Sequence, residues 1–231
     1  MRKVIVFDLD DTLYDEYEYV KSGFQAVSEY LWREFGFDTN ETYNRMWNSL
    51  KCEGRGTIFD GLLKYFGITQ RKYVKKCLSV YRLHQPEIIL PKESNEILRQ
   101  LHKKVPLYLV TDGNKVVQAN KIYALRLEMY MKKCYITYRY GHAKSKPSPY
   151  CFQLIAKSEG VSTADIVYIG DNPKKDFVGI KPLGFRTIRV MTGQHSQVEM
   201  PIQYEAELRI NHISDLIPAL KQIWCNFVIE G

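Results

Sequence analysis

Cysteine and long apolar runs are scarce in this sequence of 231 residues, and each shortage excludes a class of protein. The five cysteines are widely spaced and form no Cys-x-x-Cys pair, so they indicate neither a disulfide framework nor a zinc site. A signal sequence needs about 7–15 consecutive apolar residues and a membrane span about 20. The run after the charged N-terminus stops at Asp8, and no run of either length occurs in the chain. We therefore expect reduced thiols, no membrane partner and a cytoplasmic location.

Repeats and low-complexity tracts are also absent, and the composition is ordinary for a globular protein. Apolar residues make up 45% and charged residues 26%, which excludes wholesale disorder and collagen-like structure. The length suits one domain of about 100–200 residues with an insertion, or two small domains. Acidic residues are outnumbered, 26 against 33 basic residues, for a net charge of +7. This excess is compatible with a nucleic acid, an anionic membrane, a small phosphorylated substrate or solubility alone.

The first part of the chain combines one strand with several helices. Lys3–Phe7 is a run of β-branched and aromatic residues that ends in acids, which is typical of a buried strand. Apolar residues from Val20 to Phe35 recur at intervals of three and four and predict an amphipathic helix that ends at Gly36. Two more helices are predicted, one at Ile58–Phe66 and one at about residues 71–83. A linker is predicted between Pro86 and Pro91.

Strands and helices are predicted to alternate in the rest of the chain. The predicted strands are Leu107–Val110, Cys134–Thr137, Ile166–Ile169 and Arg186–Val190. The predicted helices are Lys115–Leu125, Pro149–Glu159, Pro173–Lys181 and Ser214–Ile223. This alternation predicts an α/β fold with a parallel sheet covered on both faces. Ligands bind beyond the carboxyl ends of such strands, so the chemistry is expected just after Phe7, Val110, Thr137 and Ile169.

Two carboxylates follow the first strand directly. Asp8 and Asp10 flank Leu9, and residues two apart in an extended segment share a side. Crowding two carboxylates raises a pKa or requires a cation, and Mg²⁺ fits oxygen ligands of this kind. The alternative is that these acids only cap a turn.

Polar residues follow the other three strands as well. Thr111-Asp112-Gly113-Asn114 offers a hydroxyl and a glycine-containing turn whose amides suit an anion at a helix N-terminus. Lys146 lies in the loop after the third strand, and Gly170-Asp171 with Asp176 follows the fourth. Alone, each segment is also compatible with an ordinary turn or a solvated charge. Four of them in order, each at a strand end, indicate a common site.

These segments resemble the four motifs of the haloacid dehalogenase superfamily. Asp8-x-Asp10-x-Thr12 is similar to the first motif, Thr111 to the second, Lys146 to the third, and Gly170-Asp171 with Asp176 to the fourth. The resemblance implies a Rossmann-like catalytic core at residues 1–14 and 92–231. It also implies that residues 15–91 form a small all-helical cap domain of the first type, inserted after the first strand.

The resemblance further implies a Mg²⁺-dependent phosphatase that forms an aspartyl-phosphate. Asp8 would be the nucleophile, Asp10 would protonate the leaving oxygen and then activate water, and Lys146 would neutralise charge. Mg²⁺ would be held by Asp8, by the backbone carbonyl of Asp10 and by Asp171. Asp176 would orient Lys146 or a metal-bound water, and Thr12 would support the site from the surrounding layer. Donating a proton requires that Asp10 have a raised pKa or be protonated at the moment of attack.

Phosphate binding is assigned by the same resemblance to Thr111, Asp112 and Lys146 and to the amides near Gly113 and Asn114. The second motif is Thr-Asp-Gly, where many relatives have Thr-Asn-Gly. Asp112 therefore adds a negative charge beside the phosphate site and leaves the anion geometry open. Family members that cleave carbon–halogen bonds generally lack an acid two residues after the nucleophile, so Asp10 favours phosphate esters.

Substrate selection is expected to involve Arg55 and Tyr14. Glycines flank Arg55, which suits a flexible loop that presents a guanidinium to an anion, although a solvated turn has the same sequence. Tyr14 stands where the chain leaves the core, but tyrosine is abundant here and packing explains it equally well. Neither residue identifies the substrate, and the oligomeric state stays open.

The functional alternatives are a phosphomutase or phosphotransferase acting on a sugar phosphate, and a catalytically idle binding module. The basic residues are concentrated at Gly61–Pro86 and Met129–Ser158, with six in each and no acid. These segments hold 12 of the 33 basic residues and leave 21 against 26 acids elsewhere. No nucleic-acid-binding motif accompanies them, so we expect a small phosphorylated substrate and no nucleic-acid partner.

Overall fold

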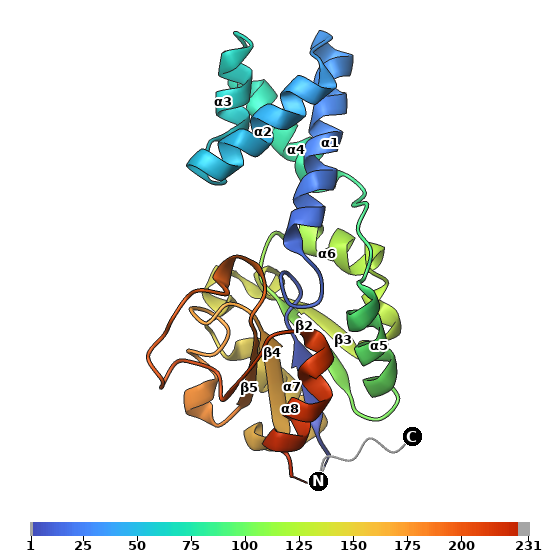
Figure 1. The fold of residues 1–231 in the computed structure, drawn as a ribbon, viewed down its shortest axis with the longest axis vertical. Helices are drawn as coiled ribbons and strands as arrows, with labels where there is room; N and C mark the ends of the chain where they lie inside the picture. The colour runs from blue at the N-terminus through green and yellow to red at the C-terminus, as the bar shows by residue number, and fades with distance from the viewer. Residues whose placement is uncertain (1, 226–231) are drawn as a thin grey trace. The chain divides into compact units, whose positions relative to one another are not determined.

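The computed structural model describes residues 2–225 and divides into two units, each with a buried interior (Figure 1). The core unit consists of Met1–Glu16 and Ile89–Gly231, and the helical unit consists of Tyr17–Ile88. The helical unit is an insertion in the sequence between the first and second strands of the core unit. Its role as a cap domain stays a prediction.

Within residues 2–225, the core unit is built on a six-stranded sheet whose strands all run parallel. The strands are β1 (Val4–Phe7), β2 (Leu107–Thr111), β3 (Lys133–Ile136), β4 (Ile166–Gly170), β5 (Arg186–Val190) and β6 (Leu208–Ile210). Their order is β3-β2-β1-β4-β5-β6, with Phe7 level with Leu109 and Ile169. The carboxyl ends of β2 and β4 therefore flank that of β1, and the site forms there. The predicted parallel α/β fold is confirmed, and β6 adds a strand that was not predicted.

Helices of the core unit cover the sheet. They are α5 (Lys92–Leu101), α6 (Lys115–Ala124), α7 (Tyr150–Glu159) and α8 (Leu216–Ile223). Every residue of β1 is fully buried, as expected for a parallel strand covered on both faces. On one face, Val4 and Val6 share a buried apolar cluster with Phe152 and Ile155 of α7. Because this packing anchors the strands, the loops at their ends can carry polar groups.

The predicted helix over Pro173–Lys181 is wrong, because the chain forms successive turns there. The amide of Asp176 donates to the Asn172 carbonyl at 2.9 Å, and the Asp176 carboxylate accepts from the Asn172 amide at 2.8 Å. Gly179 then packs so closely on Pro147 that a Cβ would lie 1.7 Å from the Pro147 carbonyl oxygen. The segment is thus a series of turns with isolated helix-type hydrogen bonds, held at the strand end by the Asp176 carboxylate and by the contact of Gly179 with Pro147.

The helical unit has an apolar interior formed by its helices. They are α1 (Glu16–Phe35), α2 (Thr39–Glu53), α3 (Ile58–Tyr65) and α4 (Arg71–Leu83). Phe24, Val27 and Leu31 of α1 are buried at the predicted spacing. The helix α2, which was not predicted, begins after Asp38, whose side chain accepts a hydrogen bond from the Glu41 amide at 2.7 Å. Across residues 2–225, no helix combines the length and the apolar character that crossing a membrane requires.

Candidate active site

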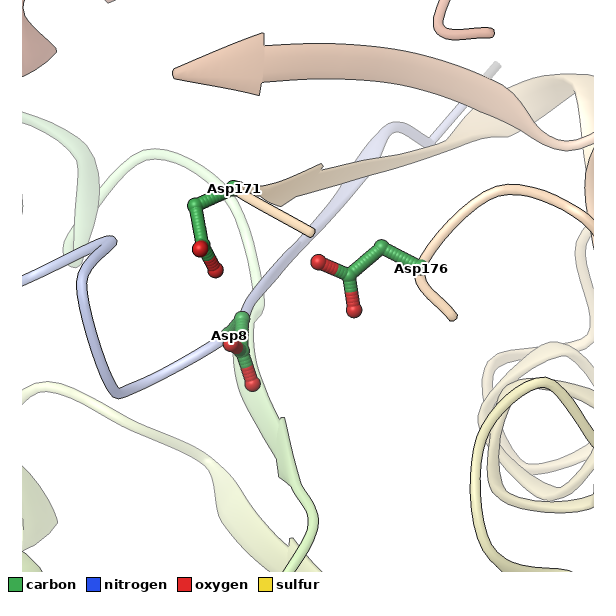
Figure 2. Close-up of side chains that lie close together, drawn as sticks. All are labelled: Asp8, Asp171 and Asp176. Carbon is green, nitrogen blue, oxygen red and sulfur yellow. The ribbon is translucent and has the colours of Figure 1, made fainter. Parts of the chain in front are cut away.

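Three buried carboxylates meet at the carboxyl ends of β1 and β4. Asp8 follows β1, Asp171 follows β4, and Asp176 lies in the turn after Asp171. One oxygen of each lies within 4.8 Å of the others, and Figure 2 shows the three side chains close together. The predicted pairing of the first and fourth motif segments in space is therefore observed for these three residues.

Negative charge accumulates in this cluster. Burial raises the pKa of Asp8 to about 7, with Asp176 adding to the rise and Lys146 opposing it. Burial and the charges of Asp8 and Asp176 raise the pKa of Asp171 to about 9. A divalent cation would relieve this repulsion, because it stabilises the ionised form of each carboxylate. The donors are carboxylate oxygens, which fit Mg²⁺.

Lys146 is the cation that the fold places among these acids. Its Nζ lies 2.7 Å from Asp8 Oδ1 and 2.8 Å from Asp176 Oδ1, and it donates to the Tyr168 hydroxyl at 3.0 Å. Burial lowers the pKa of Lys146, but Asp176 and Asp8 outweigh it and hold the pKa well above its usual value. Sequence reasoning missed Tyr168, whose one signal is a phenol within an otherwise apolar strand.

Gly170 allows Asp176 to approach Lys146. A Cβ on Gly170 would lie 2.4 Å from Asp176 Oδ2, and that oxygen also accepts the hydrogen bond from the Asn172 amide. The glycine of the fourth motif is thus required by the close approach of a carboxylate, and not by an unusual φ angle.

The Asp10 carboxylate is held by three donors on the other side of the site. The Tyr14 hydroxyl and Lys121 Nζ each lie 2.7 Å from Oδ1, and Gln118 Nε2 donates to Oδ2 at 2.8 Å. Burial raises the pKa of Asp10, but Lys121 and these hydrogen bonds outweigh it and lower the pKa below its usual value. The raised pKa considered for a proton donor is not found in this arrangement, because Lys121 neutralises the carboxylate.

Sequence reasoning missed Lys121 and Gln118. Both are buried on α6, and with Ile122 they follow the three- and four-residue spacing of one helix face. The sequence signal for these residues was the presence of a lysine and a glutamine on the apolar face of the helix that follows the second motif. A lysine in a helix is ordinarily assigned to solvent, so the signal is weak without the fold.

Side chains of the second-motif segment form hydrogen bonds with other residues of the core unit. Thr111 Oγ1 accepts a hydrogen bond from Gln118 at 2.6 Å. Asp112 Oδ1 accepts from Thr137 Oγ1 at 2.6 Å and from the Lys146 amide at 3.1 Å. Its carboxylate therefore anchors the loop that carries Lys146. The phosphate-binding role predicted for Asp112 stays a prediction.

The turn after Thr111 leads into α6. Asn114 Oδ1 accepts from the amides of Val116 and Val117 at 3.0 and 3.3 Å, so its side chain caps the helix. Gly113 has a φ of +133°, a conformation that favours glycine. The turn thus places backbone amides at a helix N-terminus beside Thr111, as anion binding requires.

A cavity of about 180 Å³ is lined by the acids, by Thr111 and by Lys146. Two of its further lining residues, Gln194 and His195, come from the loop after β5 and were not predicted. The loop approaches at Gly193, where a Cβ would lie 2.3 Å from Asp11. His195 Nε2 lies 2.9 Å from Asn172 Nδ2, and burial lowers the pKa of His195 below its usual value. A neutral ring can accept that amide hydrogen bond.

The remaining predicted residues differ in their surroundings. Thr12 is buried, and its hydroxyl has no hydrogen-bond partner among residues 2–225. Tyr14 is buried, and its hydroxyl donates to Asp10 Oδ1; its role in substrate selection stays a prediction. Arg55 is exposed between α2 and α3 in the helical unit. Its contact with substrate stays a prediction.

Comparisons with known proteins identify relatives over almost the whole chain. A glyceraldehyde 3-phosphate phosphatase from Methanocaldococcus jannaschii is 27% identical over 232 residues, covering 96% of this chain and 99% of the relative. A HAD-superfamily hydrolase structure from Geobacter sulfurreducens has a TM-score of 0.67 at 17% identity, covering 95% of this chain and 96% of the other. A magnesium-bound HAD hydrolase from Bacillus subtilis has a TM-score of 0.64 at 18% identity, covering 95% and 98%.

These structural likenesses establish the fold, and the sequence match establishes the family. Residues 2–184 match the description "haloacid dehalogenase-like hydrolase". That span includes each of the four motif segments and most of the sheet. The family predicted from the motifs is therefore confirmed, and the chain belongs to the haloacid dehalogenase-like hydrolases.

Proposed function

We propose that this chain is a Mg²⁺-dependent phosphatase that hydrolyses a small phosphorylated metabolite through an aspartyl-phosphate on Asp8. The observation that carries the proposal is the 2.7 Å contact between Lys146 Nζ and Asp8 Oδ1 within a cavity that Asp171 and Thr111 also line. This arrangement combines a nucleophile, a fixed positive charge and oxygen donors for a metal. The archaeal relative's name, a phosphatase of a three-carbon phosphate ester, supports the substrate class.

In the first half of the reaction, Asp8 attacks phosphorus and the bond from phosphorus to the ester oxygen breaks. Lys146 orients the Asp8 carboxylate, and Thr111 with the amides near Gly113 and Asn114 binds the phosphoryl oxygens. Asp8, Asp171 and the Asp10 carbonyl would hold Mg²⁺, which when bound supplies positive charge that polarises the phosphoryl group. Asp10 gives its proton to the departing oxygen.

In the second half, Asp10 takes a proton from water, and the resulting hydroxide attacks the phosphorus of the aspartyl-phosphate. The bond to Asp8 breaks, and inorganic phosphate leaves. The contacts from Lys121, Tyr14 and Gln118 favour the ionised Asp10 that this step needs. For the first half Asp10 must carry a proton, which its Oδ2 can hold while Oδ1 keeps the contacts with Lys121 and Tyr14.

The helical unit would act as the cap that selects the substrate, with Arg55 contacting an anionic group and Tyr14 shaping the entrance through Asp10. Its position in the sequence supports this role, because it is inserted between the strands that end at Asp8 and Thr111. Substitution Arg55→Ala is expected to raise KM more than it lowers kcat, since Arg55 would bind the substrate outside the reacting atoms.

The proposal is tested by a screen of phosphate esters for release of inorganic phosphate with Mg²⁺, with glyceraldehyde 3-phosphate among them. Asp8→Asn is expected to lower turnover by at least about a thousandfold, and removal of divalent metal by EDTA should abolish it. The matched control is Asp165→Asn, because Asp165 also pairs with a lysine of the core unit but precedes β4.

Turnover that survives Asp8→Asn or persists in EDTA would refute the mechanism. A phosphomutase would return the phosphoryl group to a sugar hydroxyl, so analysis of sugar-phosphate products separates it from a phosphatase. Absence of any turnover would favour the idle binding module.

A further inference from the structure

Two polar side chains of α6 lie behind the acid–base residue and outside the cavity. Lys121 and Gln118 are each 2% exposed, and neither is among the residues that line the cavity. Both contact Asp10, which does line it. Lys121 Nζ also lies 3.5 Å from Oε1 of Glu16, a further lining residue. Anything the two side chains contribute to the reaction must therefore act through Asp10, Thr111 or Glu16, and the shorter contacts are those with Asp10 and Thr111.

We propose that Lys121 and Gln118 are positioning residues that hold the Asp10 carboxylate for proton transfer. Gln118 would also fix the position of that carboxylate relative to Thr111, the residue proposed to bind phosphate. This inference rests on the proposed phosphatase function. It adds residues outside the four motifs and assigns their effect to proton transfer by Asp10, which the protonation of the leaving oxygen reports.

The hydrogen bonds restrain both oxygens of Asp10. Lys121 and Tyr14 bind Oδ1 at 2.7 Å, and Gln118 binds Oδ2 at 2.8 Å. A carboxylate bound at both oxygens cannot rotate freely, and its direction is set by the rigid helix that carries two of the donors. Such second-layer contacts matter because a misplacement of about 1 Å can lower a rate about a hundredfold.

Gln118 also joins the acid to the phosphate site. The same Nε2 that donates to Asp10 donates to Thr111 Oγ1 at 2.6 Å. An amide nitrogen carries two hydrogens, so it can serve both acceptors at once. Gln118 thereby holds both Asp10, which would protonate the leaving oxygen, and the Thr111 hydroxyl, which would bind the phosphoryl group.

A purely structural role explains this arrangement less well. A buried ion pair often stabilises a fold no more than apolar residues of similar volume would. The face of α6 that holds Lys121 and Gln118 also holds Ile122, so apolar packing is available to this helix. The polar pair lies where it meets Asp10, which indicates selection for the position of that carboxylate.

The test compares two esters that differ in their need for an acid. The oxygen of an alkyl phosphate leaves poorly without a proton, whereas p-nitrophenolate leaves without one. We would measure kcat/KM, which reports steps up to release of the leaving group, with p-nitrophenyl phosphate and with an alkyl phosphate that the wild-type enzyme hydrolyses. The variants are Lys121→Met and Gln118→Leu, with Lys3→Met as the matched control, since Lys3 pairs with Asp165 before β1 and β4.

For Lys121→Met we expect kcat/KM to fall about a hundredfold on the alkyl ester, within the range of general acid catalysis, and less than about fivefold on the p-nitrophenyl ester. Gln118→Leu should also lower kcat/KM more on the alkyl ester than on the p-nitrophenyl ester, with smaller losses. Lys3→Met should leave kcat/KM unchanged on both esters. Equal losses on both esters, or no loss on either, would overturn the inference while leaving the phosphatase intact. A wild-type enzyme that hydrolyses no phosphate ester of the screen would overturn the proposed function itself, and the inference with it.

A double variant guards against misfolding of Lys121→Met. Asp10→Asn/Lys121→Met removes both charges of the 2.7 Å pair together, so the ion-pair partner that is lost is the 3.5 Å one of the part-exposed Glu16. If Lys121 acts through Asp10, the double variant should be no less active on the alkyl ester than Asp10→Asn alone. A further loss of tenfold or more would show that Lys121 acts by another route and would contradict the inference.

Discussion

The two units of this chain differ most in what they bury. Among residues 2–225, the buried polar side chains of the helical unit are Ser28 and Thr42, and neither is charged. The core unit buries carboxylates, lysines and an arginine, namely Asp8, Asp11, Lys121, Lys146, Asp165, Asp171, Asp176, Arg189 and Glu205. The helical unit is instead filled by aliphatic and aromatic groups around Phe24.

The two units therefore differ in how their interiors are stabilised. Burying an uncompensated charge costs several kcal/mol, and the core unit offsets this cost by pairing, as between Lys146 and Asp8 and between Arg189 and Glu205. The helical unit has no such requirement in its interior, so its stability depends on apolar packing. Substitutions of the buried groups around Lys146 can therefore change activity and stability together, whereas substitutions in the interior of the helical unit should change stability alone.

The largest combined effect on activity and stability is expected from Lys146→Met. The change leaves Asp8 and Asp176 without the ammonium that contacts both, so turnover should fall by at least about a hundredfold. The free energy of unfolding should fall by about 3–5 kcal/mol, since one partner of a buried ion pair is removed. Phosphate release and urea denaturation measure the two effects.

Asp8→Asn sharpens this first prediction. Burial already raises the pKa of Asp8 to about 7, so a neutral isostere there should leave the free energy of unfolding nearly unchanged while turnover is lost. Equal destabilisation by Lys146→Met and Asp8→Asn would contradict this expectation and show that the Asp8 charge contributes as much to stability as the Lys146 charge.

A smaller but still large effect is expected from Phe24→Ala in the helical unit. Phe24 is 2% exposed, and its ring lies 5.3 Å from that of Trp47 in an edge-to-face arrangement. Truncation should destabilise the unit by about 3–5 kcal/mol, measured by hydrogen exchange of residues 17–88. Trp32→Ala on the same helix is the control, because Trp32 is 58% exposed and should change stability little.

Strand ends and motif acids were predictable from the sequence, and helix interiors were less so. The strand before Asp8 is short, β-branched and bounded by acids, so its place and the position of Asp8 follow from local pattern. The same holds for Ile166–Gly170 and Asp171. Parallel pairing then brings these ends together without any side-chain detail, which is why the acidic cluster was predictable.

What could not be predicted depends on contacts between distant segments. Lys121 looks like a surface lysine until α6 is placed against Asp10, 111 residues away in sequence. The turns after Pro173 look helical until Gly179 is placed against Pro147. In both cases a tertiary contact overrides a local preference, and no periodicity in a single sequence reports it.

An intermediate effect is expected from adding one methyl group at Gly170. In Gly170→Ala the new Cβ would lie 2.4 Å from Asp176 Oδ2, so Asp176 must move away from Lys146. We expect a loss of about 1–3 kcal/mol in the free energy of unfolding and a measurable fall in kcat. The contrasting variant is Gly61→Ala in α3 of the helical unit, where a Cβ meets nothing within 4 Å.

Gly61→Ala should stabilise the chain by about 0.4–1 kcal/mol, because alanine lowers the entropy of the unfolded state and favours a helix. Changes of opposite sign in the free energy of unfolding for the two glycine variants would support the contrast between a crowded site and an open helix surface. If both variants destabilised the chain, crowding at Gly170 would lose its explanatory value.

The smallest effect is expected from a charge pair of the core unit that lies away from the site. Lys3 Nζ contacts Asp165 Oδ1 at 2.6 Å, and this hydrogen bond lowers the pKa of Asp165. A lowered pKa in the folded state contributes stability that is present above the unfolded value of about 3.9 and is lost as pH falls through the folded value. Asp165→Asn should therefore cost about 0.2–1 kcal/mol at pH 7, and the difference from wild type should shrink below about pH 4. Urea denaturation at several pH values measures it, and a difference that persists undiminished in acid would mean that Asp165 stabilises the fold through uncharged contacts, such as the one with Ser162.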